Sequence, residues 1–283
     1  MHRGLGKFVI AGGLCMVAGA EIAGAAPCGG AGTLRLPENA LVAFYGDVDY
    51  DKAGLSEAGI LYPAPSALGL LAGIMTHGIV ESKMKSAQKQ HMRDEADKVL
   101  VPYRDYLRQY EYRDLMARGL AAMSMADFKL MAHRDKSGNG AIIDTTPVYF
   151  FSQDARTLML LNTFEIVDPA ATATMPEKTT VKIVAAARTE PDMQAYWLAN
   201  DAGALADISA NMFGESVRLA IADHCGKFTD RTSPYRTVRY AVGGAVRMER
   251  AQVLEESAER ILMRTLRGWL MSVPVRQAEP PDP

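Results

Sequence analysis

The chain lacks an excess of charge of either sign. It holds 31 lysine and arginine side chains against 33 aspartates and glutamates, a formal net charge of −2 over 283 residues. Proteins that hold nucleic acid typically carry a strong basic excess, so we expect no nucleic acid among the partners. The chain also lacks the composition of a disordered, collagen-like or polytopic membrane protein, because 48% of its residues are hydrophobic and 23% are charged. That apolar fraction can build a core, and the length suits one large domain or two small ones.

Catalytic and metal-binding motifs are missing as well. The sequence contains no H-E-x-x-H or C-x-x-C pattern for zinc and no G-x-S-x-G turn for a serine hydrolase. We therefore expect no metal and no cofactor, and the sequence nominates no catalytic residue. Action by binding is favoured over catalysis.

One acidic stretch copies the start of a calcium-binding EF-hand loop. Asp47, Asp49 and Asp51 alternate as the first calcium ligands do. The sixth position is Lys52 instead of the required glycine, and the twelfth is Ala58 instead of a bidentate glutamate. A solvated acidic loop is therefore favoured over a metal site.

The start of the chain has the pattern of a signal peptide. Arg3 and Lys7 precede an apolar run from Phe8 to Ala20, and Ala23-Gly24-Ala25 supplies the A-x-A spacing that a signal peptidase reads. We predict residues 1–25 to be a signal peptide and the protein to be periplasmic or secreted. The alternative is an uncleaved anchor, but the apolar run is too short to span a bilayer comfortably.

Two cysteines remain after such a cleavage, Cys28 and Cys225. In an oxidising compartment we expect a disulfide between them, which would tie the N-terminus to the body of the protein. Two free thiols are the first alternative. A lipid anchor on Cys28 is the second, although Ala25-Ala26-Pro27 does not supply the residues that lipidation requires.

Helices are predicted mainly in the first half of the chain. Ser66 can cap a helix that runs to about Leu100, and Pro102 should break or kink it. A second helix is expected from Tyr103 to Met123. The first helix is apolar at its front, and its basic stripe follows at Lys85, Lys89 and Arg93. Burial in the protein core is favoured over insertion in a membrane interface, so at most peripheral membrane contact is expected.

Strands are predicted mainly in the second half. A hairpin is expected where Gly243-Gly244 joins two alternating stretches, and residues 254–267 fit either a helix or a strand. Further strands are expected at 41–45, 146–151, 157–167 and 180–186, with a helix at 204–222. The predicted fold class is α+β, with long N-terminal helices packed on a mainly antiparallel sheet, a later helix and a C-terminal hairpin. Residues 26–40 form a flexible lead-in, 41–276 one α+β domain and 277–283 a disordered tail.

The C-terminal region is the most basic part of the chain. Ten basic and five acidic side chains lie between Lys227 and Arg276, and nine of the ten are arginine. Arginine binds carboxylate and phosphate with two-pronged geometry. We therefore predict contact with an anionic envelope component, which could be a lipid headgroup, a polysaccharide or an acidic protein. The simpler alternative is a basic face that pairs with acidic groups of the same molecule. The candidate binding residues are Arg250, Arg260, Arg264 and Arg267.

Two segments resemble uncharacterised exported proteins of Gram-negative bacteria. The first runs from Tyr62-Pro63-Ala64-Pro65 to Leu107 and includes Ala96-Asp97-Lys98-Val99-Leu100; the second is Arg264-Thr265-Leu266-Arg267-Gly268-Trp269. The resemblance implies an envelope location and carries no activity. We predict an exported periplasmic or secreted protein that acts by binding, as an accessory protein of the bacterial envelope. The alternative is an exported hydrolase whose site the sequence does not show.

Overall fold

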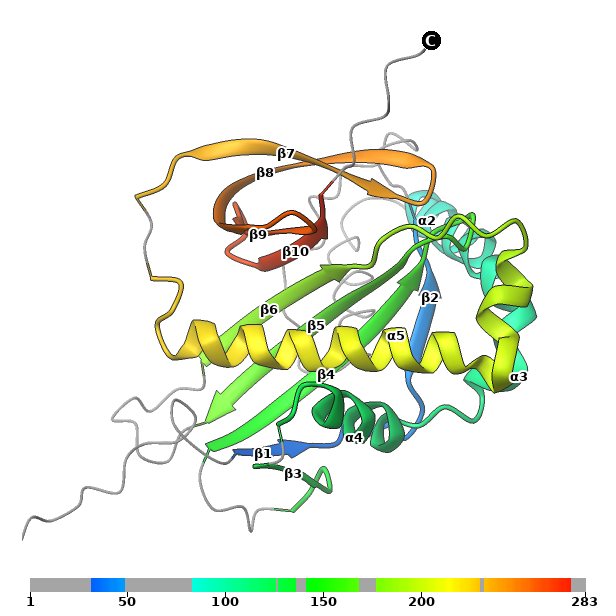
Figure 1. Cartoon of the computed structure of the whole chain (residues 1–283). Coiled ribbons are helices and arrows are strands. Elements are labelled where there is room, and N and C mark those ends of the chain that lie inside the picture. Colours follow the sequence, from blue (N-terminus) through cyan, green and yellow to red (C-terminus); the bar gives the residue numbers. More distant parts are fainter. Residues whose placement is uncertain are drawn as a thin grey trace, which may run out of the picture.

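A computed structural model describes residues 32–48, 83–125, 127–135, 141–167, 177–229 and 232–275. Within these ranges ten strands form one sheet in the order β3-β1-β4-β5-β6-β10-β9-β8-β7, with β2 also paired to β4 (Figure 1). The strands are β1 Gly32–Arg35, β2 Ala43–Gly46, β3 Phe128–Met131, β4 Ala141–Phe151, β5 Leu158–Val167, β6 Glu177–Val184, β7 Tyr235–Val242, β8 Ala245–Glu256, β9 Arg260–Thr265 and β10 Leu270–Pro274. The helices are α2 Lys83–Ala96, the 3-10 helix η2 Asp97–Tyr103, α3 Arg104–Leu107, α4 Tyr112–Ala122 and α5 Met193–His224.

Helices α4 and α5 cover one face of the sheet over β4, β5 and β6 (Figure 1). Asp192 caps α5, because its Oδ1 accepts a hydrogen bond of 2.9 Å from the backbone N–H of Ala195. The two helices touch where Gly119 meets Gly214. A Cβ added at Gly214 would lie 2.4 Å from the carbonyl oxygen of Gly119, so the contact requires glycine.

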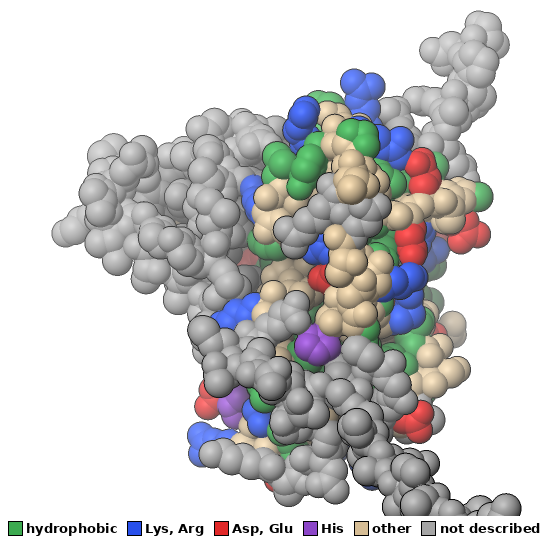
Figure 2. Space-filling view, turned by 90° about the vertical axis from the view of Figure 1, so that its left-hand side faces the viewer, with side chains coloured by type: hydrophobic (Ala, Val, Ile, Leu, Met, Phe, Trp, Pro, Cys, Tyr) green, Lys and Arg blue, Asp and Glu red, His purple; other side chains and the backbone are tan. Residues whose placement is uncertain are grey.

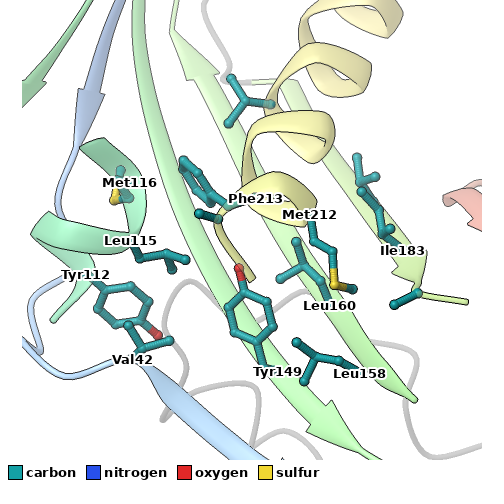
Figure 3. Packing of buried hydrophobic residues seen from close by; sticks show 14 of the residues in the cluster. Val42, Tyr112, Leu115, Met116, Tyr149, Leu158, Leu160, Ile183, Met212 and Phe213 are labelled. Carbon is teal, nitrogen blue, oxygen red and sulfur yellow. The ribbon is translucent and has the colours of Figure 1, made fainter. Parts of the chain in front are cut away.

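The main core lies between these helices and the sheet. Tyr149 and Leu160 point from β4 and β5 toward Met212 and Phe213 on α5 (Figure 3). The hydroxyl of Tyr149 donates a 2.7 Å hydrogen bond to the carbonyl of Ser209, which satisfies a polar group that is fully buried. Helix α5 is thus held against the sheet by packing and by hydrogen bonds from the strands.

The C-terminal strands enclose a second core on the opposite face. Met159 and Val184 alternate with the residues that face α5, so they point away from the helix. Val238, Tyr240 and Val242 of β7 pack in the same cluster. The sheet therefore curls, so that its last strands lie across the face of β5 and β6 that is turned away from α5 (Figure 1).

The predicted fold class is wrong. The sheet is mixed and dominates the structure, and no long N-terminal helix packs on it within the described residues. Four strand pairings are parallel: β1 with β3, β1 with β4, β2 with β4, and β6 with β10. The N-terminal strands β1 and β2 share one edge of β4, because β5 occupies the other edge. Their parallel direction depends on how distant segments meet, which the order of elements in the sequence does not reveal.

The helix predicted from Tyr103 to Met123 is interrupted. The backbone N–H of Val42 donates to the carbonyl of Tyr110, and the N–H of Tyr112 donates to the carbonyl of Ala40. These bonds hold Glu111 in an extended conformation, and α4 starts only after it. A tertiary pairing therefore outweighs the local helix preference.

Several other predicted elements lie close to their expected positions. The strands at 146–151 and 157–167 fall in β4 and β5, and the helix at 204–222 lies inside the longer α5. Residues 254–267, for which the sequence fits either a helix or a strand, contain the end of β8 and all of β9. They therefore form strands and not a helix. Several predicted features lie outside the described residues. They are the signal peptide and Cys28 within residues 1–31, the front of the first predicted helix at 66–82, and the tail at 277–283.

The Gly243-Gly244 hairpin is present as β7 and β8. Gly243 has φ +57°, where a Cβ is strained, and an added Cβ would lie 2.3 Å from Oδ1 of Asp154. Gly244 does not have a positive φ, and its added Cβ would lie 3.7 Å from Oδ2 of Asp154. The turn therefore requires glycine for its backbone conformation at Gly243 and not at Gly244.

Candidate functional site

Some basic side chains of the C-terminal region make contacts within the molecule, and others are exposed at its surface. Arg260 is directed into the sheet, where its Nε donates to Oγ of Ser272 at 2.9 Å and its Nη2 donates to the carbonyl of Val184 at 2.9 Å. Burial lowers the pKa of this guanidinium. Arg260 therefore joins β6, β9 and β10 and is not presented to a partner.

Arg264 lies in an ion pair at the C-terminal end of α5. Its Nη2 lies 2.5 Å from Oδ1 of Asp223, and the two side chains are only 12% and 13% exposed. The same guanidinium donates to the carbonyls of Phe228 and Gly268, both at 3.2 Å. Arg264 therefore connects the sheet to the end of α5.

Three more basic side chains are neutralised within the molecule. Lys227 pairs with Glu255 at 2.7 Å, and Arg236 pairs with Glu256. Arg247 pairs with Asp47 at 2.5 Å, in a largely buried position where the two residues are 200 apart in sequence. Asp47, the first residue of the acidic stretch, is thus used in an ion pair, while Asp49 and Asp51 lie outside the described residues.

Arg239 and Arg250 are different, because both are exposed and make no ion pair within the described residues. In the β7–β8 ladder Arg239 lies opposite Met248, and Arg250 lies opposite Thr237. Ala241 and Val246 form the next pair toward the turn. Residues opposite each other share a face of the sheet. These residues alternate with the buried Val238, Tyr240 and Val242, so they point outward.

We call this set the outer β7–β8 face: Thr237, Arg239, Ala241, Val246, Met248 and Arg250. It combines two arginines with two strongly exposed apolar side chains, because Val246 is 49% and Met248 63% exposed. Figure 2 shows basic and apolar side chains next to each other at the top of the molecule, the end at which Figure 1 places β7 and β8.

The turn between β9 and β10 lies next to this face. Thr265 is paired with Ala251, the neighbour of Arg250, and the exposed Leu266 follows Thr265 directly. In the same turn the guanidinium of Arg267 lies over the ring of Trp269, 5.4 Å from its centroid. Of the four arginines predicted from sequence, the structure therefore brings Arg250 and Arg267 to the surface and places Arg260 and Arg264 in internal contacts.

The sequence analysed alone does not single out Arg239, Val246 and Met248 as a group. The signal that could have found them was present, because the turn at Gly243 sets the register of the hairpin. Once the register is known, the period-two alternation shows which side chains share the outer face.

Other kinds of site find little support in the part of the chain that is described. No group of three or more histidine, cysteine, aspartate or glutamate side chains that could hold a metal ion occurs among those residues. Cys225, just after α5, is disulfide-bonded; its pairing with Cys28 lies outside the described residues and stays a prediction. Among the described helices none is both long and apolar enough to cross a bilayer.

Comparison of the chain with models of protein families, with curated proteins and with solved structures yields no match. The resemblance to exported proteins of Gram-negative bacteria therefore stays a prediction from the sequence. A function has to be argued from the geometry and charge of the outer β7–β8 face itself.

Proposed function

We propose that the protein is an exported binding protein of the bacterial envelope, which contacts an anionic component through the outer β7–β8 face. The signal-peptide pattern at residues 1–25 supports export. Arginine is suited to the contact because its guanidinium forms paired hydrogen bonds with phosphate, sulfate and carboxylate groups.

The observation that carries the proposal is the difference in pairing among the C-terminal basic residues. Lys227, Arg236, Arg247 and Arg264 each have an acidic partner in the same molecule. Arg239 and Arg250 have none within the described residues, although the chain as a whole carries a slight acidic excess. Two exposed cations on adjacent strands, which form no ion pair with any described residue, can bind an external anion without breaking such a pair.

The proposal is tested with two anionic probes, dextran sulfate and vesicles that contain phosphatidylglycerol. Binding to at least one probe should weaken steeply as salt is raised to physiological strength, because exposed charges are screened. The double variant R239Q/R250Q should weaken this binding about 30-fold, since each arginine near an anionic surface contributes roughly 1 kcal/mol.

The matched control is R104Q/R113Q, which removes two arginines that are also exposed but lie on α3 and α4. This variant has the same net charge as R239Q/R250Q and should bind almost as well as the unchanged protein. Equal losses in the two variants would show that only net charge matters, and the proposed site would then be rejected. No binding to either probe would reject the function itself.

No observation within the described residues favours the exported hydrolase that the sequence left as the alternative.

A further inference from the structure

We infer that the anionic component is the surface of a lipid bilayer, and that Met248 and Val246 enter its interface while Arg239 and Arg250 bind lipid phosphates. This inference rests on the proposed function and adds the class of partner. Its basis is the apolar part of the outer β7–β8 face, which charge alone does not explain.

The two exposed apolar side chains lie directly against the arginines. Met248 is opposite Arg239 in the ladder, and it lies two residues from both Val246 and Arg250 on β8. A highly charged polysaccharide would engage the arginines and leave Met248 and Val246 in water. A bilayer interface accommodates both groups, because phosphates lie at the level of the headgroups and the acyl boundary takes up apolar side chains.

The shape of this surface also favours a bilayer. The six side chains stand on one face of two adjacent strands, so they meet a flat partner together. Arg239 and Arg250 occupy diagonal positions, about 7–8 Å apart at the backbone, which allows them to contact separate phosphates. Leu266, 63% exposed in the neighbouring β9–β10 turn, extends the apolar area beside Arg250.

A carboxylate beside the turn affects where on the hairpin the contact lies. Asp154 lies under the turn, where its Oδ2 accepts a 2.8 Å hydrogen bond from the backbone N–H of Gly244. Its negative charge disfavours approach of the turn itself to an anionic membrane. The centre of the contact is therefore at Met248, between the two arginines, and not at Gly243-Gly244.

The experiment compares the variant V246T/M248S with the unchanged protein on two probes. The first probe is vesicles of phosphatidylglycerol and phosphatidylcholine, and the second is dextran sulfate, which offers charge without an apolar phase. We expect V246T/M248S to lower vesicle affinity about tenfold and to leave dextran sulfate binding unchanged. Pure phosphatidylcholine vesicles should not bind, since they lack net negative charge.

The control V101T/V167T removes apolar groups from two other exposed positions, which are 50% and 42% exposed. It should bind both probes as the unchanged protein does, and far-ultraviolet circular dichroism should show all variants folded. All four substituted side chains are exposed, so loss of fold is not expected to obscure the result.

The outcomes separate the two proposals. If dextran sulfate binds but the vesicles do not, or if V246T/M248S binds vesicles normally while R239Q/R250Q does not, the lipid inference is overturned and the anionic contact stands. If neither probe binds, both proposals fail. A loss that is confined to vesicles in V246T/M248S supports the lipid surface over a polysaccharide or an acidic protein.

Discussion

Two pairs of arginines on the C-terminal strands of the sheet serve different purposes. Arg260 and Arg264 on β9 point into the molecule, where they bind carbonyls and Asp223. Arg239 and Arg250 on β7 and β8 point outward and have no ion pair within the described residues. The side chain is the same in all four cases. The difference therefore comes from what the curled sheet places beside each side chain. Arg264 meets Asp223 at the end of α5, and Arg260 meets Val184 of β6 and Ser272 of β10.

This difference has energetic consequences. An ion pair that is removed from water is costly to break, because the remaining charge keeps its desolvation penalty without its partner. An exposed charge stays solvated by water, so removing its partner changes the free energy of unfolding little. Substitutions at the contacts of Arg260 and Arg264 should therefore change stability, whereas substitutions at the outer β7–β8 face should change binding.

The largest change in stability is expected at the ion pair between Arg264 and Asp223. Replacing Asp223 by asparagine (D223N) leaves Arg264 as a nearly buried charge without a counterion, and we expect a loss of about 3 kcal/mol in the free energy of unfolding. Urea denaturation of the variant measures this loss. The control D207N removes the partner of Arg118 in an ion pair that is mostly exposed, and it should cost less than about 0.5 kcal/mol. Similar losses in both variants would contradict the distinction between inner and outer charges.

The turn that orients the outer face should be the next most sensitive position. A valine at Gly243 (G243V) would be strained at φ +57° and would meet Asp154, so we expect a cost of about 2 kcal/mol. The same substitution at Gly244 should cost less than about 1 kcal/mol, because its φ is not positive and its surroundings are more open. Thermal melts of the two variants give the order, and a more stable G243V than G244V would contradict the turn geometry.

A smaller, pH-dependent effect is expected at Asp154, which supports that turn. Burial raises the pKa of Asp154, but hydrogen bonds from Ser152 and from the backbone N–H groups of Arg156 and Gly244 lower it more, so the net pKa is below its ordinary value of 3.8. The folded state therefore favours the ionised form. Its contribution to stability is complete above pH 3.8 and is lost as the pH falls through the lowered pKa.

The variant D154N should therefore lose less stability on acidification than the unchanged protein does over this range. Unfolding by urea at a series of pH values provides the comparison. D105N serves as the control, because the side chain of Asp105 is fully exposed, and it should follow the unchanged protein. A steeper loss in D154N would contradict the assigned hydrogen bonds.

The smallest change in stability is expected at the outer face. R239Q/R250Q should alter the free energy of unfolding by less than about 0.5 kcal/mol, because neither guanidinium has a partner to lose within the described residues. Urea denaturation measures it beside D223N. A loss as large as that of D223N would mean that the outer arginines also hold the fold, and binding losses in this variant could not then be assigned to the surface.

Local sequence signals located individual elements better than their arrangement. Gly243-Gly244 marked the β7–β8 hairpin, and the β-branched and aromatic residues marked β4 and β5. The sequence does not predict the short β1 and β3, whereas the apolar run at 41–45 predicts the equally short β2. The local pattern predicts one helix from Tyr103 to Met123, because it contains no sign of the backbone hydrogen bonds that join Tyr110 and Tyr112 to Val42 and Ala40.

The candidate site shows the same division. The sequence by itself determined that the C-terminal region is rich in arginine and that a hairpin lies within it, because composition and turn residues are local properties. Only the tertiary structure decided which of these arginines are exposed and can bind an external partner. The end of α5 brings Asp223 to Arg264, and the curl of the sheet places Asp47 beside Arg247, 200 residues away in sequence. Pairing of charges depends on distances in space, and those distances are set by the packing of strands and helices that lie far apart along the chain.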